Sequence, residues 1–447
     1  MFKTLVGAFK NKDIRKKIIY TLLILVVVRV GSLLPIPGVD TNYFSSLLSG
    51  INTGDLSYLS AFTGGSFERM SLFALSITPY ITSSIIMQLL TIAIPKLEEM
   101  QKEGEDGRKK IAAITRYVTI ALALIESIAM AVGFGRSGLI KGYQGFSTLH
   151  YIVSIIVVVA ALTAGSAMLM WLGERITDKG IGNGISFIIL IGIIARFPDA
   201  LIQEVVSRVA NKSGGLIMFI IEVVFLLLVI GAAILLVQGV RKIPVQYAKR
   251  IVGNKQYGGA RQYIPLKVNA AGVMPIIFAQ AIMFIPITFI GFSNNVNNAG
   301  GFLHAFTDHT SFWYNFVFAV MIILFTYFYT AITINPTQMA EDMKRNNGFI
   351  PGIKPGKKTA EYIDDIMSRI TLPGSFFLAL VAIMPAFAGI FGVQAGFAQF
   401  FGGTSLLILV GVVLDTLQQV ESHLLMRHYD GLLKSGRIKG RAGVAAY

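Results

Sequence analysis

The sequence predicts an all-α integral membrane protein, and three observations support this fold class. Hydrophobic residues make up 54% of the 447 residues and charged residues only 14%, whereas soluble domains carry about 25% charged residues. The mean hydropathy is +0.66. Apolar runs of the roughly 17–25 residues that a bilayer requires recur along the whole chain. A soluble globular fold is therefore excluded.

We expect ten transmembrane helices, and the fifth of them, IGNGISFIILIGIIARF, is near the lower length limit for crossing. The expected spans cover about 18–34, 71–94, 112–134, 151–172, 182–197, 214–238, 272–292, 313–335, 371–391 and 404–425. The N-terminus is basic, but the apolar stretch after it is long enough to span, so we expect no cleavable signal peptide.

The basic residues support this count. The two tails and the even-numbered connections hold 32 of the 39 Lys and Arg residues, the odd-numbered connections hold six, and Arg29 lies inside the first span. This asymmetry is the positive-inside pattern, and it predicts that both termini and every large loop are cytoplasmic. The net charge of +15 then belongs to one face, which either sets topology and attracts anionic lipid or docks a large partner. The lengths of loops 239–268 and 336–370 favour docking.

The expected spans contain few residues that could support catalysis or bind an ion. Charges within them (Arg29, Glu126, Glu222 and Asp415) stand singly, and for the two glutamates a helix–helix hydrogen bond is the favoured interpretation. The five histidines lack metal-ligand spacing, cysteine is absent, and GIGNG (180–184) lacks the strand and helix of a nucleotide fingerprint. We therefore expect no enzyme activity, no cofactor and no metal.

Isoleucines recur at helical spacing in two spans. Ile77 and Ile81, and again Ile185 and Ile189, lie four residues apart and so share one helix face. Such pairs usually pack against other helices or lipid, and composition cannot distinguish this role from a pore constriction.

Nine stretches together resemble the SecY family, the channel subunits of the bacterial protein-conducting Sec translocase, which are related to the alpha subunit of the endoplasmic-reticulum channel. They are PIPGVD (35–40), SLFALSITPYITSSIIMQLL (71–90), EGEDGRKKIAAITRY (103–117), MWLGERITDKGIGNGIS (170–186), YAKR (247–250), PLKVNAAGVMPIIFA (265–279), FYTAITINP (328–336), GFIPGIKPG (348–356) and FGGTSLLILVGVVLD (401–415).

The resemblance implies a fold of two inverted, pseudo-symmetric halves, residues 1–200 with spans one to five and residues 201–447 with spans six to ten. They form an hourglass pore that opens sideways to lipid between spans two and three and spans seven and eight. A re-entrant plug helix, here about 55–69, fills the outer funnel; its candidate residues are Leu59, Phe62, Gly64, Gly65, Phe67 and Arg69. Irregular backbone at membrane depth is tolerated where it lines a cavity or is buried in protein.

The implied function is a passive channel that passes unfolded secretory polypeptides across the bacterial plasma membrane and releases signal sequences and transmembrane segments sideways into lipid. The positions that match the family's pore ring are all isoleucine: Ile77, Ile81, Ile185, Ile189, Ile277 and Ile408. Branched apolar side chains can close a pore by dewetting without binding the passing chain. The positions that match the lateral gate are Gln88 and Asn269, which could also form ordinary interhelical hydrogen bonds.

The basic loops and tail resemble the docking surface for the SecA ATPase and the ribosome. The expected contacts are Arg241, Lys242, Lys249, Arg250, Lys255, Lys344, Arg345, Lys354 and Tyr429. Lys354 replaces the family's usual arginine, which keeps the charge but loses the forked donor geometry.

Further expected partners are SecE, SecG, other Sec accessory proteins, preproteins with signal peptides, and membrane lipid, without sequence-specific nucleic acid. Energy would come from SecA, a translating ribosome or the proton-motive force. Two alternatives remain from the sequence: a secondary transporter for a small solute, which should show midplane ion ligands, and a membrane-inserted docking scaffold.

Overall fold

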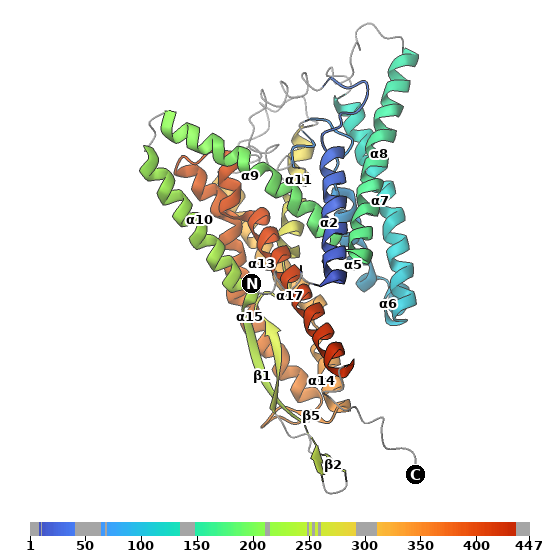
Figure 1. Ribbon diagram of the computed structural model, residues 1–447, viewed down its shortest axis with the longest axis vertical. Coiled ribbons are helices and arrows are strands. Elements are labelled where there is room, and N and C mark those ends of the chain that lie inside the picture. The colour runs from blue at the N-terminus through green and yellow to red at the C-terminus, as the bar shows by residue number, and fades with distance from the viewer. Residues whose placement is uncertain are drawn as a thin grey trace. The chain divides into compact units, whose positions relative to one another are not determined.

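The computed structural model describes residues 9, 11–40, 64–67, 69–134, 148–210, 215–247, 250–252, 255–257, 261–291 and 311–434. Long helices dominate this part of the chain (Figure 1). They are α2 (Lys12–Gly31), α5 (Thr78–Ala93), α7 (Glu105–Phe134), α8 (Thr148–Lys179), α9 (Gly184–Ala210), α10 (Gly215–Gln238), α11 (Met274–Gly291), α13 (Phe312–Thr333), α15 (Lys357–Ile390) and α17 (Gly403–Lys434). Shorter elements are α6 (Pro95–Lys102), α14 (Pro336–Arg345), α16 (Ala395–Ala398) and the 3-10 helix η4 (Gln399–Phe401).

Each expected span overlaps one of these long helices. Within the described residues, seven helices are long and apolar enough to cross a membrane, and the α5–α6 pair, bent by 105°, would make an eighth. The helix α2 also overlaps an expected span, but its first turns carry Lys12, Arg15, Lys16 and Lys17, which shortens its apolar part. The chain is therefore a multi-pass helical membrane protein.

The chain forms two compact units. Unit 1 comprises Met1–Pro198 with Val412–Tyr447, and unit 2 comprises Asp199–Gly411. The first boundary falls inside α9, which continues through Pro198 to Ala210, although the sequence predicts the end of this span near residue 197. Proline is tolerated within transmembrane helices because neighbouring groups satisfy the freed carbonyl. The division into inverted halves stays a prediction.

In unit 1, small and hydroxyl side chains hold α5, α7 and α8 together. The hydroxyls of Ser83 on α5 and Thr119 on α7 are 2.5 Å apart, and Thr163 of α8 donates to Ser127 of α7 at 3.1 Å. A Cβ on Gly165 would stand 1.9 Å from the Leu72 carbonyl oxygen, so α8 requires glycine there. Close approach and side-chain hydrogen bonds are the main adhesion available between helices in lipid. These three helices consequently form one packed block.

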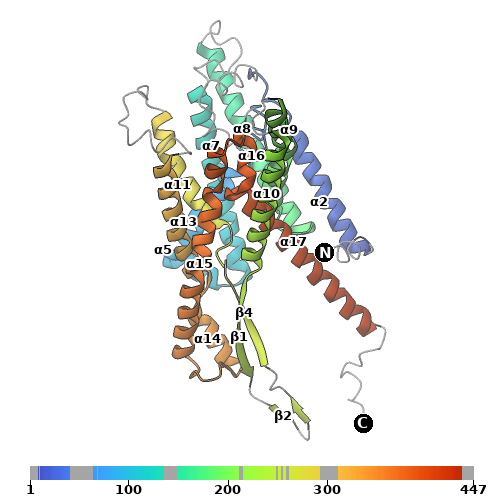
Figure 2. The same ribbon diagram turned by 90° about the vertical axis from the view of Figure 1, so that its left-hand side faces the viewer.

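The two basic loops fold together in unit 2 (Figures 1 and 2). Strand β1 (Val240–Tyr247) pairs antiparallel with β4 (Arg261–Lys267) on one side and with β5 (Gly348–Phe349) on the other, and β2 (Arg250–Val252) pairs with β3 (Lys255–Tyr257). Pro244 lies in β1 outside the part that pairs with β5, so its missing N–H costs no bond there.

A buried apolar cluster joins this sheet to α14 and α15. Its members are Ile243, Val245, Leu266, Met343, Ile350, Ile363 and Met367. The helix α14 begins where the Asn335 side chain accepts from the backbone N–H groups of Thr337 and Gln338, and it ends in Lys344 and Arg345, the charge that favours a helix C-terminus. The two loops are thus one folded module.

Candidate channel and docking site

Four of the six candidate pore isoleucines lie in unit 1. Ile77 immediately precedes α5 and is 2% exposed, and Ile189 on α9 is 7% exposed. Ile81 and Ile185 are half-buried. The Cγ1 atom of Ile185 lies 3.0 Å from the position of a Cβ on Gly173, so this side chain packs against α8.

The other two isoleucines lie in unit 2. Ile277 is half-buried in the first turn of α11 in unit 2, and Ile408 on α17, before the unit boundary at Gly411, is 4% exposed. Each of the six is at least partly buried, and the ring that would join them stays a prediction.

The candidate plug falls mainly outside the described residues, including Leu59 and Phe62. Gly64, Gly65 and Phe67 form a turn in which the glycines adopt φ of +62° and +85°. Phe67 is buried in a cluster with Ile36, Met70 and Leu162, whereas Arg69 is exposed.

Residues 69–77 continue as turns, and α5 begins only at Thr78, seven residues later than the expected start of this span. The segment is held to the chain that follows α2: Pro35 pairs with Ser71, and the N–H of Ile36 donates to the Met70 carbonyl at 3.0 Å. Met70 and Ser76 adopt positive φ, which no α-helix accommodates. These bonds to the chain after α2 override the helical periodicity.

The two candidate gate residues lie in different environments. Gln88 is exposed near the end of α5. Asn269, between β4 and α11, has a buried Oδ1 without a hydrogen-bond partner in the described part of the chain. Such an acceptor costs free energy until a donor reaches it.

Most of the candidate docking residues lie on the folded module of the basic loops. Arg241 and Lys242 are exposed on β1, Lys344 and Arg345 are exposed at the end of α14, and Lys354 is exposed beyond β5. Arg250 and Lys255 lie on the paired strands β2 and β3, Tyr429 lies on α17, and Lys249 falls outside the described residues. This module therefore exposes at least five basic side chains: Arg241, Lys242, Lys344, Arg345 and Lys354.

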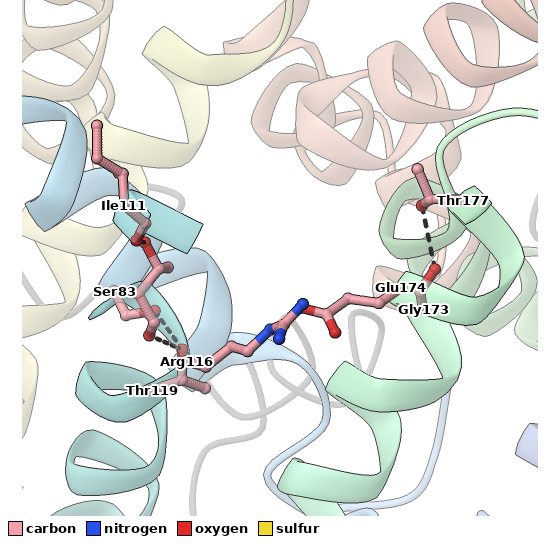
Figure 3. Close-up of polar contacts among 8 residues, drawn as sticks. Ser83, Ile111, Arg116, Thr119, Gly173, Glu174 and Thr177 are labelled. Carbon is pink, nitrogen blue, oxygen red and sulfur yellow. Dashed lines mark hydrogen bonds and ion pairs between the residues drawn. The ribbon is translucent and has the colours of Figure 1, made fainter. Parts of the chain in front are cut away.

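Figure 3 shows an ion pair that fastens α7 to α8. Arg116 Nε donates to Glu174 Oε1 at 2.7 Å, and both side chains are partly exposed, at 51% and 24%. The Ser83–Thr119 contact lies nearby on the α5–α7 side. The pair adds to the block of α5, α7 and α8.

Unit 2 contains a buried ion cluster that the sequence pattern does not predict, since Glu222 stands there as a single charge. Arg208 Nε donates to Glu204 Oε1 at 2.9 Å, and its Nη2 donates to Glu222 Oε1. The second oxygen of Glu204 accepts from the Gln394 backbone N–H at 2.8 Å. All three charged side chains are at most 5% exposed. The i, i+4 spacing of Glu204 and Arg208 is a sequence signal for this ion pair, but both residues lie in the expected connection between the fifth and sixth spans.

Among the described residues, no group of three or more His, Cys, Asp or Glu side chains is arranged to hold a metal ion.

Comparison with known proteins gives a family for most of the chain. The SecY family model matches residues 71–417. Protein translocase subunit SecY of Streptomyces coelicolor is 43% identical over 97% of this chain and 100% of its own length. The same subunit of Halalkalibacterium halodurans is 45% identical, with the same coverage.

Solved structures agree in fold. A protein-conducting channel matches with a TM-score of 0.61 at 18% identity over 91% of each chain. A SecY channel, studied for the plug domain that stabilises its closed state, matches with a TM-score of 0.60 at 18% identity, again over 91% of each chain. Sec61 in a canine ribosome–channel complex matches with a TM-score of 0.57 at 16% identity and covers 91% of each chain. With a family model that matches residues 71–417 and relatives matched end to end, this chain belongs to the SecY family.

Proposed function

We propose that this protein is a protein-conducting channel, which passes unfolded preproteins across a bacterial plasma membrane and releases apolar segments sideways into lipid. The observation that carries the proposal is the end-to-end similarity to protein translocase subunits, at 43–45% identity over 97% of the chain. A multi-pass helical fold that carries a large basic module fits a channel that a soluble motor feeds. The proposed topology has ten spans in two inverted halves, with both termini cytoplasmic.

The six isoleucines are proposed to form the constriction. A polypeptide channel must admit every side chain while it leaks neither ions nor protons, and one charge crossing 100 mV carries about 2.3 kcal/mol. A ring of apolar branched side chains dewets when the channel is empty and forms no directional bonds with a passing chain. The turn at Gly64–Gly65 is proposed as the described end of the plug.

The lateral gate is proposed to respond to apolar segments. A signal sequence has an apolar core of roughly 7–15 residues. At about −0.5 kcal/mol per leucine-like residue, ten such residues gain on the order of 5 kcal/mol in lipid. A seam closed by a few kcal/mol would open for a signal sequence and stay closed otherwise. The unmet acceptor of Asn269 and the amide of Gln88 are candidates for setting this bias.

The basic module is proposed as the docking surface. Its strands and α14 are held by one apolar cluster, so its arginines and lysines are presented on a preformed surface. Structural neighbours of this chain include channels in ribosome complexes, which supports a ribosome as one partner. SecA, SecE and SecG, and drive by the SecA ATPase or the proton-motive force, are part of the same proposal.

Reconstitution tests the proposal. Proteoliposomes that contain this chain with SecE and SecG are supplied with SecA, ATP and a labelled preprotein, and protease-protected preprotein is the expected product. Solute uptake against a gradient without protected preprotein would instead indicate a transporter, and neither product would indicate a scaffold.

The constriction is tested by Ile81→Ser, which places a hydroxyl in the proposed ring. We expect ion leakage through the resting channel. The matched control is Ile92→Ser on the same helix, where the side chain is 52% exposed and no leakage is expected. Equal conductance of the two variants would contradict the ring.

A further inference from the structure

The Gly64–Gly65 turn lies between two arginines that come from different helices of unit 1. Arg29 of α2 donates from Nη1 to the carbonyl oxygen of Gly64 at 3.3 Å. On the other side, a Cβ on Gly65 would lie 3.4 Å from Nη2 of Arg196 on α9. The backbone of the turn is therefore held between two guanidinium groups.

The surroundings of the turn, formed by Arg29, Gly192 and Arg196, are called its seat below. Only glycine fits at positions 64 and 65 of the turn. Gly64 and Gly65 both adopt positive φ, where a side chain is strained. A Cβ on Gly64 would stand 2.8 Å from the Cα of Gly192 and 2.9 Å from Arg29 Nη1. A third glycine, on α9, thus allows the turn to approach the helix backbone closely enough for Arg29 to reach its carbonyl.

A small cavity beside the turn has a wall of both apolar and polar side chains. Arg29, Ser32, Ser66 and Ser76 contribute to its wall. Ser66 is 1% exposed, and its hydroxyl has no hydrogen-bond partner in the described part of the chain. A buried hydroxyl that the protein leaves unsatisfied weakens the seated state. The turn is therefore held by a hydrogen bond from the charged Arg29 but leaves the Ser66 hydroxyl unsatisfied. This combination is expected of a turn that must also be able to leave its seat.

The position of Arg29 is unusual for its charge. It lies in the last turn of α2, at the end that the expected topology places outside, where arginines are depleted. A positive charge there does favour the helix C-terminus, but a lysine would serve equally. Here the guanidinium points inward to a backbone carbonyl, which a lysine's flexible point charge holds less well.

We propose that Arg29 is a positioning residue that holds the Gly64–Gly65 turn in its seat and thereby favours the closed channel, with Arg196 as the opposite wall. The effect on channel closure rests on the proposed channel function, but the contact between Arg29 and Gly64 can be measured without a transport assay.

The measurement uses the absence of cysteine from the chain. Ser66→Cys introduces a single thiol that is buried while the turn is seated, and its reaction rate with a small maleimide reports release. Ser375→Cys on α15, at 0% exposure in unit 2, reports loosening of the whole protein. Each cysteine variant is combined with Arg29→Met, Arg29→Lys or the control Arg175→Met, whose guanidinium lies 5.2 Å from the Trp171 ring centre on α8.

We expect Arg29→Met to accelerate labelling at position 66 about 10-fold to 100-fold, the range set by loss of one hydrogen bond to a charged group. Arg29→Lys should fall between Arg29→Met and the parent, and Arg175→Met should match the parent. An unchanged rate in Arg29→Met, an equal rise at position 375, or full retention in Arg29→Lys would overturn the proposal.

A measurement of resting ion conductance distinguishes the Arg29–Gly64 contact from its proposed effect on channel closure. Faster labelling with raised conductance in Arg29→Met supports both the seat and its role in closure. Faster labelling without raised conductance would confirm the seat and contradict its role in closing the channel, and preprotein transport by the parent protein tests the channel function independently.

Discussion

Replacing Arg208 by methionine should severely destabilise unit 2. Arg208 is the shared partner of Glu204 and Glu222, and all three side chains are at most 5% exposed. Without the guanidinium, the two buried carboxylates that it bridges would face each other without a cation, and their repulsion would disfavour the folded state. Breaking a buried ion pair by removing one partner typically costs about 3–5 kcal/mol, which we expect for this variant.

The assay is unfolding by sodium dodecyl sulfate in mixed micelles, followed by far-ultraviolet circular dichroism. The matched control is Arg116→Met, which breaks an ion pair with Glu174 that is partly exposed and should cost about 1 kcal/mol or less. Glu222→Gln should cost less than Arg208→Met, because it keeps an acceptor for the guanidinium and removes the excess negative charge. Equal losses in Arg208→Met and Arg116→Met would refute the reasoning.

Two further predictions concern helix packing and use the same unfolding assay. Gly374→Ala on α15 should destabilise by about 1–3 kcal/mol, because the new Cβ would lie 2.9 Å from the Val268 carbonyl oxygen, whereas Gly231→Ala on α10 meets nothing within 4 Å and should stabilise by about 0.5–1 kcal/mol; a loss in both would show that crowding is not the cause. A double-mutant cycle on Ser83→Ala and Thr119→Ala should give a coupling free energy of about 0.6 kcal/mol and at most about 1.7 kcal/mol, and additive effects would mean that the 2.5 Å contact contributes nothing.

The sequence predicts the helices well because a bilayer demands long apolar runs, and each expected span overlaps a helix in the described part of the chain. It fails where tertiary contacts decide the backbone. The end of α9 lies beyond Pro198, because the buried cluster of Glu204, Arg208 and Glu222 holds the following turns. Apolar periodicity cannot reveal this, since the stabilising residues are charged.

The start of α5 shows the opposite error. The apolar run from Ser71 onward predicts a helix, but hydrogen bonds to Leu34 and Ile36 and the positive φ of Ser76 keep these residues in turns until Thr78. The sequence predicts the basic loops from their length and charge, but not strand β5, which depends on pairing with β1 from more than 80 residues earlier, as in Gln246 with Phe349. The hydrophobic pattern within one segment does not specify the register in which it pairs with a distant strand.

The hydroxyl contacts in unit 1 constrain how the proposed lateral gate could move. Ser83 on α5 bonds Thr119 on α7, and Ser166 on α8 donates to the Ser76 carbonyl just before α5 at 3.1 Å. Gly165 also brings α8 against the Leu72 carbonyl, which leaves no space for a Cβ at this contact. Each interhelical bond is worth only about 0.6 kcal/mol. Opening that separated α5 from α7 and α8 would nevertheless break all of these contacts and leave buried acceptors unmet. Motion of the three helices as one block breaks none of them, so the free energy gained when an apolar segment enters lipid would not have to offset the loss of these contacts.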